Sequence, residues 1–113
     1  MKNIIFILLA LTFTTMIKAE TNNPLLTKFN ESIPFNLISS KNIDDATNSV
    51  LEKSDAILDN IINVKSDRSF ENTLLPLDEI YAIIEKAWSP AYLLANVSTD
   101  KSIRESGLAA SEK

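Results

Sequence analysis

The chain has 113 residues, with 11 Lys and Arg against 15 Asp and Glu, and it contains no His and no Cys. Without these two residue types it cannot build a His or Cys zinc site, a Ser-His-Asp triad or a thiol nucleophile. The net charge of -4 argues against nucleic acid as a partner, because phosphate binding needs clustered Lys and Arg. The 45% hydrophobic content is typical of one small folded unit rather than of a disordered tail.

The amino terminus has the pattern of a secretory signal peptide. Lys2 provides a positive start, residues 4–17 form an almost unbroken apolar run, and Ala19 is the small residue that signal peptidase requires. A membrane anchor is the alternative, but this run would cover only about 21 Å of a ~30 Å hydrocarbon core. We therefore predict a cleaved signal peptide over 1–19 and an exported chain over 20–113, periplasmic or secreted, with no stable membrane anchor. Cleavage leaves 9 basic against 15 acidic residues, a net charge of -6.

Residues 20–37 show no helical period. They contain two prolines, Pro24 and Pro34, together with short apolar pairs. Proline restricts its own backbone and that of the residue before it, which disfavours a helix. We expect this segment to lie extended across a surface.

The next segment has the period of an amphipathic helix. Apolar and small residues recur every three or four positions over 43–64, with charged residues mostly between them. Ser39, Ser40 or Asn42 can cap the amino terminus of this helix of about 22 residues. The acidic pair 44–45 is expected in the first turn, where the helix dipole favours negative charge.

A second stretch with the same period runs from Phe70 to Leu94, and Ser69 is the expected amino-terminal cap. Pro76 lies close to the start, where proline is tolerated. Pro90 removes one helical hydrogen bond and predicts a kink, with a full stop as the alternative. A short polar connection joins the two stretches, so we predict an antiparallel helical hairpin.

A third helix is expected at the end of the chain. Residues 98–100 offer caps for a helix from Lys101, with Ile103, Leu108 and Ala110 facing inward. No Gly or Asn follows its last turn as a carboxy-terminal cap, so the helix looks truncated. The predicted fold class is all-α: an antiparallel helical hairpin plus a third, truncated helix, forming part of a larger helical fold.

Polar residues on the predicted helices have both a chemical and a structural interpretation. Two acidic pairs, Asp44-Asp45 and Asp78-Glu79, resemble acid/base or hard-cation sites. Neighbouring residues on a helix point about 100° apart, however, so the two carboxylates of a pair do not converge on one atom. We therefore favour the interpretation that these pairs lie on solvated helix faces. Glu71 and Asn72 follow Ser69, where Asn72 can satisfy the backbone at the helix entry. A substrate contact at this position is the less favoured alternative.

Four aromatic residues fall at helical spacing in the second helix. They can form a peptide-binding stripe, or they can pack against the neighbouring helix. We favour core packing, because a hairpin must bury its apolar stripe somewhere. The four residues are Phe70, Tyr81, Trp88 and Tyr92.

Six short sequence segments indicate more than the fold class. They are Asn23-Pro24-Leu25-Leu26, Ile33-Pro34-Phe35, Ile43 to Ala46, Ser69-Phe70-Glu71-Asn72-Thr73-Leu74, Trp88-Ser89-Pro90 and Ile103-Arg104-Glu105. In order and spacing they resemble the amino-terminal region of the thimet oligopeptidase family, nearest to oligopeptidase A and dipeptidyl carboxypeptidase. The resemblance covers residues 23–113. It implies a helical zinc metallopeptidase that cuts short peptides in a deep channel, with zinc held by an H-E-x-x-H helix and a further Glu, both carboxy-terminal to the matched region.

The chain departs from this family at the metal site, because it has neither His nor an H-E-x-x-H helix. We therefore expect no catalytic, cofactor-binding or metal-binding residue in it, and no activity from it alone. The resemblance implies a scaffold role: residues 20–113 form part of the channel wall of an oligopeptidase whose catalytic domain is absent here, and short peptides are substrates of the complete protein. The alternative is a stand-alone exported helical module that binds a peptide or protein. In either case the helices present more apolar surface than three of them can cover, so we predict loose packing and association.

Overall fold

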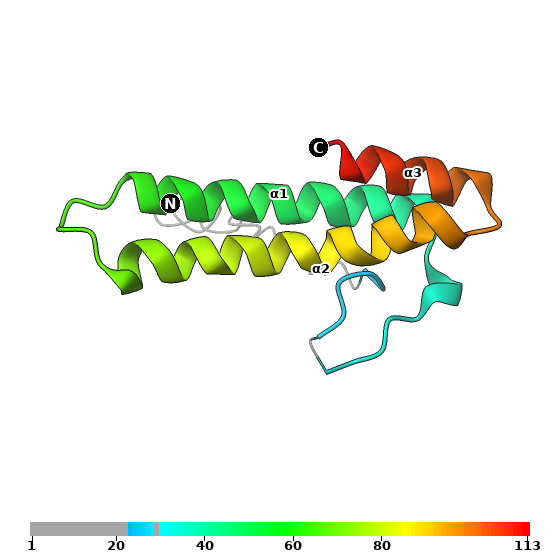
Figure 1. Cartoon of the computed structure of the whole chain (residues 1–113), viewed down its shortest axis with the longest axis horizontal. Helices are drawn as coiled ribbons and strands as arrows, with labels where there is room; N and C mark the ends of the chain where they lie inside the picture. The colour runs from blue at the N-terminus through cyan, green and yellow to red at the C-terminus, as the bar shows by residue number, and fades with distance from the viewer. Residues whose placement is uncertain (1–22, 29) are drawn as a thin grey trace, which may run out of the picture.

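The computed structural model describes residues 23–28 and 30–113; the predicted signal peptide and its alternative as a membrane anchor lie outside them. The described residues form three α-helices: α1 (Ser40–Ile62), α2 (Leu75–Val97) and α3 (Lys101–Ser111). A 3₁₀ turn, η1 (Phe35–Leu37), precedes α1, and a five-residue π-helical turn, η2 (Phe70–Leu74), opens α2. In Figure 1, α1 and α2 lie side by side as a hairpin, and α3 folds back over the end where α2 finishes. The predicted all-α hairpin with a shorter third helix is confirmed.

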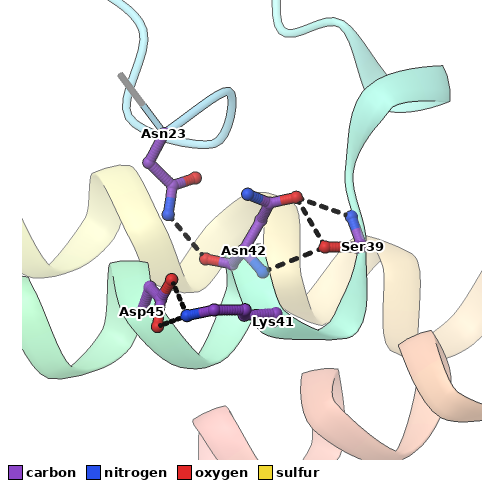
Figure 2. Close-up of polar contacts among 5 residues, drawn as sticks. All are labelled: Asn23, Ser39, Lys41, Asn42 and Asp45. Atoms are coloured by element: carbon purple, nitrogen blue, oxygen red, sulfur yellow. Dashed lines mark hydrogen bonds and ion pairs between the residues drawn. The ribbon is translucent and has the colours of Figure 1, made fainter. Parts of the chain in front are cut away.

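The same four-residue motif, Ser-x-x-Asn, starts both arms of the hairpin. At α1 the Ser39 backbone N–H donates to the Asn42 side-chain oxygen (2.9 Å), and the Asn42 N–H donates to the Ser39 hydroxyl (3.3 Å) (Figure 2). At η2 the pair Ser69 and Asn72 repeats this arrangement at 2.8 and 3.3 Å. Each reciprocal pair satisfies two backbone amides that a helix start otherwise leaves unpaired. The predicted cap at Ser69 is confirmed.

The start of α1 differs in one respect from the expectation. Of the three candidate caps, Ser39 takes the role, so the helix already begins at Ser40. The acidic pair 44–45 therefore lies beyond the first turn, which contains no acidic residue. The prediction that the helix dipole stabilises these two carboxylates in the first turn was therefore wrong, because the effect of the dipole falls off within about one turn.

The two prolines of the second arm both lie inside regular helix. Pro76 sits in the first turn of α2, as expected. Pro90 is buried, and α2 continues through it to Val97, so the alternative of a full stop at this position is wrong. The kink stays a prediction.

The third helix begins where the sequence predicts. Asp100 is its cap, and the carboxylate accepts hydrogen bonds from the backbone N–H groups of Ser102 (2.7 Å) and Ile103 (3.4 Å). Two of the three residues expected to face inward, Ile103 and Ala110, pack against the core.

Leu108, the third of these residues, is 52% exposed, so its predicted inward position is wrong. Gly107 is buried in its place. A Cβ atom at Gly107 would lie 2.6 Å from the Ala91 carbonyl oxygen and 2.9 Å from the Ala95 Cβ. The backbone of α3 thus meets α2 at a contact between small residues, and this close approach sets which side of α3 faces inward.

The segment before α1 is not simply extended on the surface, as we expected. Leu25 is completely buried and belongs to the core. Asn23 holds it there: its side-chain nitrogen donates to the Asn42 carbonyl (2.8 Å; Figure 2), and its side-chain oxygen accepts from the Leu25 backbone N–H (3.0 Å). This lead-in segment therefore anchors itself to the start of α1 through a pair of asparagines and one apolar side chain.

The buried core lies at one end of the hairpin, which we call the base. Its buried apolar side chains come from the lead-in, α1 and α2: Leu25, Ile38, Ile43, Ala46, Val50, Ala87, Ala91, Leu94 and Ala95. Residues 55–86, all of which the structure describes, include no buried residue. We call this end the tip; it consists of the outer parts of α1 and α2 with η2 and the connection between them, and α3 does not extend over it (Figure 1).

Candidate functional site

The acidic pairs do not form a convergent site. Asp44 is exposed, and Asp45 forms an ion pair with Lys41 one helical turn away (2.6 Å; Figure 2). Asp78 and Glu79 are both exposed on α2. Within residues 23–28 and 30–113 there is no cluster of three or more His, Cys, Asp and Glu able to hold a metal ion.

Glu71 and Asn72 are both engaged at the entry to the second arm. Besides its part in the cap, the Asn72 side chain donates to the Asp67 carbonyl (2.9 Å). The Glu71 carboxylate accepts from its own backbone N–H and from the Ser69 hydroxyl (2.9 Å), and these bonds lower the pKa of Glu71 below its ordinary value. Both residues thus have a local structural role at the start of η2.

The aromatic residues are not in the core, so the prediction that they pack against the neighbouring helix was wrong. Their side chains are between 38% exposed (Trp88) and 67% exposed (Tyr81). A helix that contacts its neighbours on one side buries only a stripe about 100° wide. In α2 the small residues Ala87 and Ala91 lie in that stripe, and the aromatic row lies beside it.

The aromatic row of α2 also contains carboxylates. Asp78, Tyr81, Glu85, Trp88 and Tyr92 follow one another in steps of three and four, which places them on one side of the helix. Trp88 and Tyr92 stack with ring centroids 5.2 Å apart and planes 11° from parallel. Acidic and aromatic side chains therefore alternate along one exposed side of α2.

A similar row runs along α1. Leu51, Asp55, Leu58 and Ile62 again follow in steps of four, three and four. Leu51 lines a hollow of about 290 Å³ at the carboxy-terminal end of α3, opposite Trp88 of α2. The rows of α1 and α2 thus flank the same groove, on the side of the hairpin against which α3 packs.

α3 covers only the base end of this groove. Its last residues, including Ala110 and Lys113, line the hollow, and the rows then continue towards the tip without it. We define the tip face as the apolar part of this continuation and its acidic rim. Its apolar members are Leu58, Ile62, Leu74, Leu77 and Tyr81, all exposed; Trp88 marks its boundary with the hollow, and its rim is Asp55, Asp78 and Glu85.

The charge of the described chain is also concentrated at the tip. Residues 55–86 contain seven acidic and three basic side chains, a net charge of -4. The other described residues contain seven acidic and six basic side chains, a net charge of -1. Apolar exposure and negative charge therefore coincide at the same end of the molecule.

A second hollow, of about 640 Å³, lies between the lead-in segment and α2. Its apolar lining includes Leu25, Ile33 and Pro90, and six polar residues also line it: Thr27, Lys28, Glu31, Glu85, Lys86 and Ser89. Small-molecule sites combine an apolar wall with a few polar groups fixed in place. Here the polar side chains are exposed, apart from half-buried Thr27, so no buried polar group faces the apolar wall. The tip face is the stronger candidate for a functional site.

Among the described helices, none is both long and apolar enough to cross a membrane. In comparisons with protein-family models, with curated proteins and with solved structures, the chain has no significant match.

Proposed function

We propose that the chain is a helical docking module and that its tip face receives an amphipathic helix of another polypeptide. The observation that carries this proposal is the row of exposed apolar side chains that continues the groove beyond α3. Contiguous exposed apolar surface with a polar rim is typical of interaction sites.

The chain itself supplies the precedent for a helical occupant. α3 packs against both α1 and α2 at the base, and beyond its end the rows of the two long helices continue as exposed apolar side chains. An amphipathic helix that binds in a groove contacts it through side chains spaced three, four and seven residues apart. The rows along α1 and α2 have this spacing, so a second helix laid end to end with α3 can contact both arms.

A specific form of this docking is the scaffold role in an oligopeptidase of the thimet type. The resemblance described above supports it, and so does the uncovered tip face, because a channel wall must pack against further helices of the complete protein. In this form zinc and short peptides bind elsewhere, in the H-E-x-x-H domain. In this form of the proposal, Ser69 and Asn72 cap the start of a helix in the channel wall and do not contact substrate.

The test uses a synthetic amphipathic helix of about 18 residues, with leucines on one side and uncharged glutamines on the other, long enough to be helical once bound. We expect it to bind the chain and to change the fluorescence of Trp88, which is the sole Trp. Leu58→Ser should weaken binding about tenfold, since burial of a leucine side chain contributes about 1.5–3 kcal/mol.

Leu93→Ser is the matched control, because Leu93 is exposed to a similar extent as Leu58 (47% against 43%) but lies outside the tip face. It should change the dissociation constant by less than about twofold. The docking proposal is wrong if the probe does not bind, or if the two substitutions weaken binding equally. Turnover of a short peptide by the purified chain would contradict a purely structural role.

A further inference from the structure

We infer that the partner helix is basic: the tip face selects a helix that carries Lys or Arg beside its apolar row. This inference rests on the proposed docking function and adds the chemistry of the occupant. Three observations carry it, namely the charge of the tip, the acidic rim of the tip face and the alternation of acidic with aromatic residues along α2.

The first observation is the uneven distribution of charge. The tip holds a net charge of -4 out of the -5 of all described residues. Complementary potentials steer encounters and suppress wrong partners, whereas like charges brought together are unfavourable. A second copy of this chain would place one acidic tip against another. The charge therefore favours a basic partner over self-association through this face.

The second observation is the position of the rim carboxylates. Asp55 lies between Leu51 and Leu58 in the α1 row, and Glu85 lies between Tyr81 and Trp88 in the α2 row. A helix bound along these rows would have both carboxylates within reach of its long side chains, although Glu85 also borders the hollow beside the lead-in segment. Long basic side chains suit this arrangement, because their stems cover apolar surface while their charged ends remain in water.

The third observation is the chemistry of the α2 row. A cation that approaches Glu85 also comes close to Tyr81 and Trp88, which precede and follow Glu85 by one helical turn. Aromatic faces attract cations in addition to any carboxylate. The Ser89 hydroxyl donates to the Glu85 carboxylate at 2.6 Å, which restricts the position of this acidic group within the row.

The experiment compares three probe helices of about 18 residues that share one leucine row and differ only in their polar positions, which are all Lys, all Gln or all Glu. At about 0.01 M salt we expect the Lys probe to bind at least about tenfold more tightly than the Glu probe, with the Gln probe between them. At about 1 M salt, where the Debye length falls to about 3 Å, the difference should fall below about threefold.

Two triple variants with equal net charge locate the effect. Neutralisation of the rim should reduce the Lys-over-Glu preference at low salt at least about fivefold, using Asp55→Asn, Asp78→Asn and Glu85→Gln. Neutralisation of three carboxylates outside the tip should leave the preference within about twofold, using Glu31→Gln, Asp44→Asn and Glu105→Gln. Equal effects of the two variants would overturn the inference, because the preference would then follow net charge rather than the rim.

The remaining outcomes separate this inference from the docking function. If the Gln probe binds and the three probes bind equally, docking stands and the basic partner is wrong. If the Glu probe binds most tightly, the inference is also wrong. If no probe binds, both fail. Sedimentation that shows a dimer whose formation is blocked by Leu58→Ser, but not by Leu93→Ser, would identify a second copy as the occupant and overturn the basic partner.

Discussion

At the scale of single residues, the contact between Gly107 and α2 decides how the third helix packs. The backbone of Gly107 approaches α2 so closely that a methyl group would lie within 3 Å of the Ala91 carbonyl oxygen and the Ala95 side chain. The sequence pattern pointed instead to Leu108, because a large apolar residue at helical spacing is the ordinary signal of an inward position. Two helix backbones can approach closely only where the residues between them are small. The periodic pattern does not separate such small inward-facing residues from small residues on the exposed side.

Gly107→Ala should therefore destabilise the chain, although alanine is favoured over glycine in an exposed helix by up to about 1 kcal/mol. Overpacking of this kind costs about 1–3 kcal/mol, and we expect a net loss in the free energy of unfolding measured with urea. Leu108→Ala is the control and should cost less than about 1 kcal/mol, since Leu108 is largely exposed. A larger loss at Leu108 than at Gly107 would contradict this account of the packing.

At the scale of elements, the helix starts follow local chemistry that the sequence displays directly. Ser39, Ser69 and Asp100 each begin a helical segment with a side chain that accepts from the backbone of that segment. These contacts join residues two or three positions apart, so they need no tertiary structure. They were predicted for this reason; the sequence left open only the choice among Ser39, Ser40 and Asn42 before α1 and among residues 98–100 before α3.

The cap at Asp100 predicts a pH dependence of stability. Hydrogen bonds from the Ser102 hydroxyl and backbone, then from the Ile103 backbone, lower the pKa of Asp100 below its ordinary value. A carboxylate whose pKa is lower in the folded state stabilises it above the unfolded-state pKa, near 3.9, and this contribution is lost as the pH falls through the folded-state pKa.

The measurement compares urea midpoints of the natural chain and of Asp100→Asn from about pH 6 to pH 2.5. Asparagine caps at every pH, so the difference in stability between the two proteins should shrink, or turn in favour of asparagine, below about pH 4. Glu71 titrates in both proteins and cancels in this comparison. A difference that stays constant over the whole range would show that the Asp100 charge does not contribute to the cap.

At the scale of the whole molecule, the described chain has a three-helix base and a two-helix tip. The base contains all of the buried side chains, whereas the tip has none and carries half of the exposed large apolar ones. The predicted loose packing and association of the chain stay predictions, which experiment has to test. Local stability is expected to follow the density of buried contacts, because segments with few of them open most easily.

We therefore expect amide hydrogen exchange to be slower at the base than at the tip. Backbone amides near Ile43, Val50 and Leu94 should exchange most slowly, and those in the outer turns near Ile62 and Leu77 should exchange faster by at least about tenfold. Binding of the Lys probe should slow exchange selectively at the tip. Uniform protection along both long helices of the free chain would contradict the division into base and tip.

The sequence by itself determined the elements of the described part of the chain: three helices, their approximate ends, their caps and the hairpin order. Those features depend on period and on contacts between residues close in the chain. It also identified Leu58, Tyr81 and Trp88 as members of apolar rows, but it assigned the aromatic residues to the core. Periodicity shows which residues share a side of a helix and does not show whether another element covers that side.

Tertiary structure alone decided the rest. The packing of the helices leaves the aromatic row of α2 exposed, and the close contact of Gly107 with α2 sets which side of α3 faces inward. The lead-in folds back so that Leu25 enters the core, through a hydrogen bond between Asn23 and Asn42. Each of these features depends on residues far apart in the chain, and their mutual placement is a property of the packed molecule rather than of any local pattern.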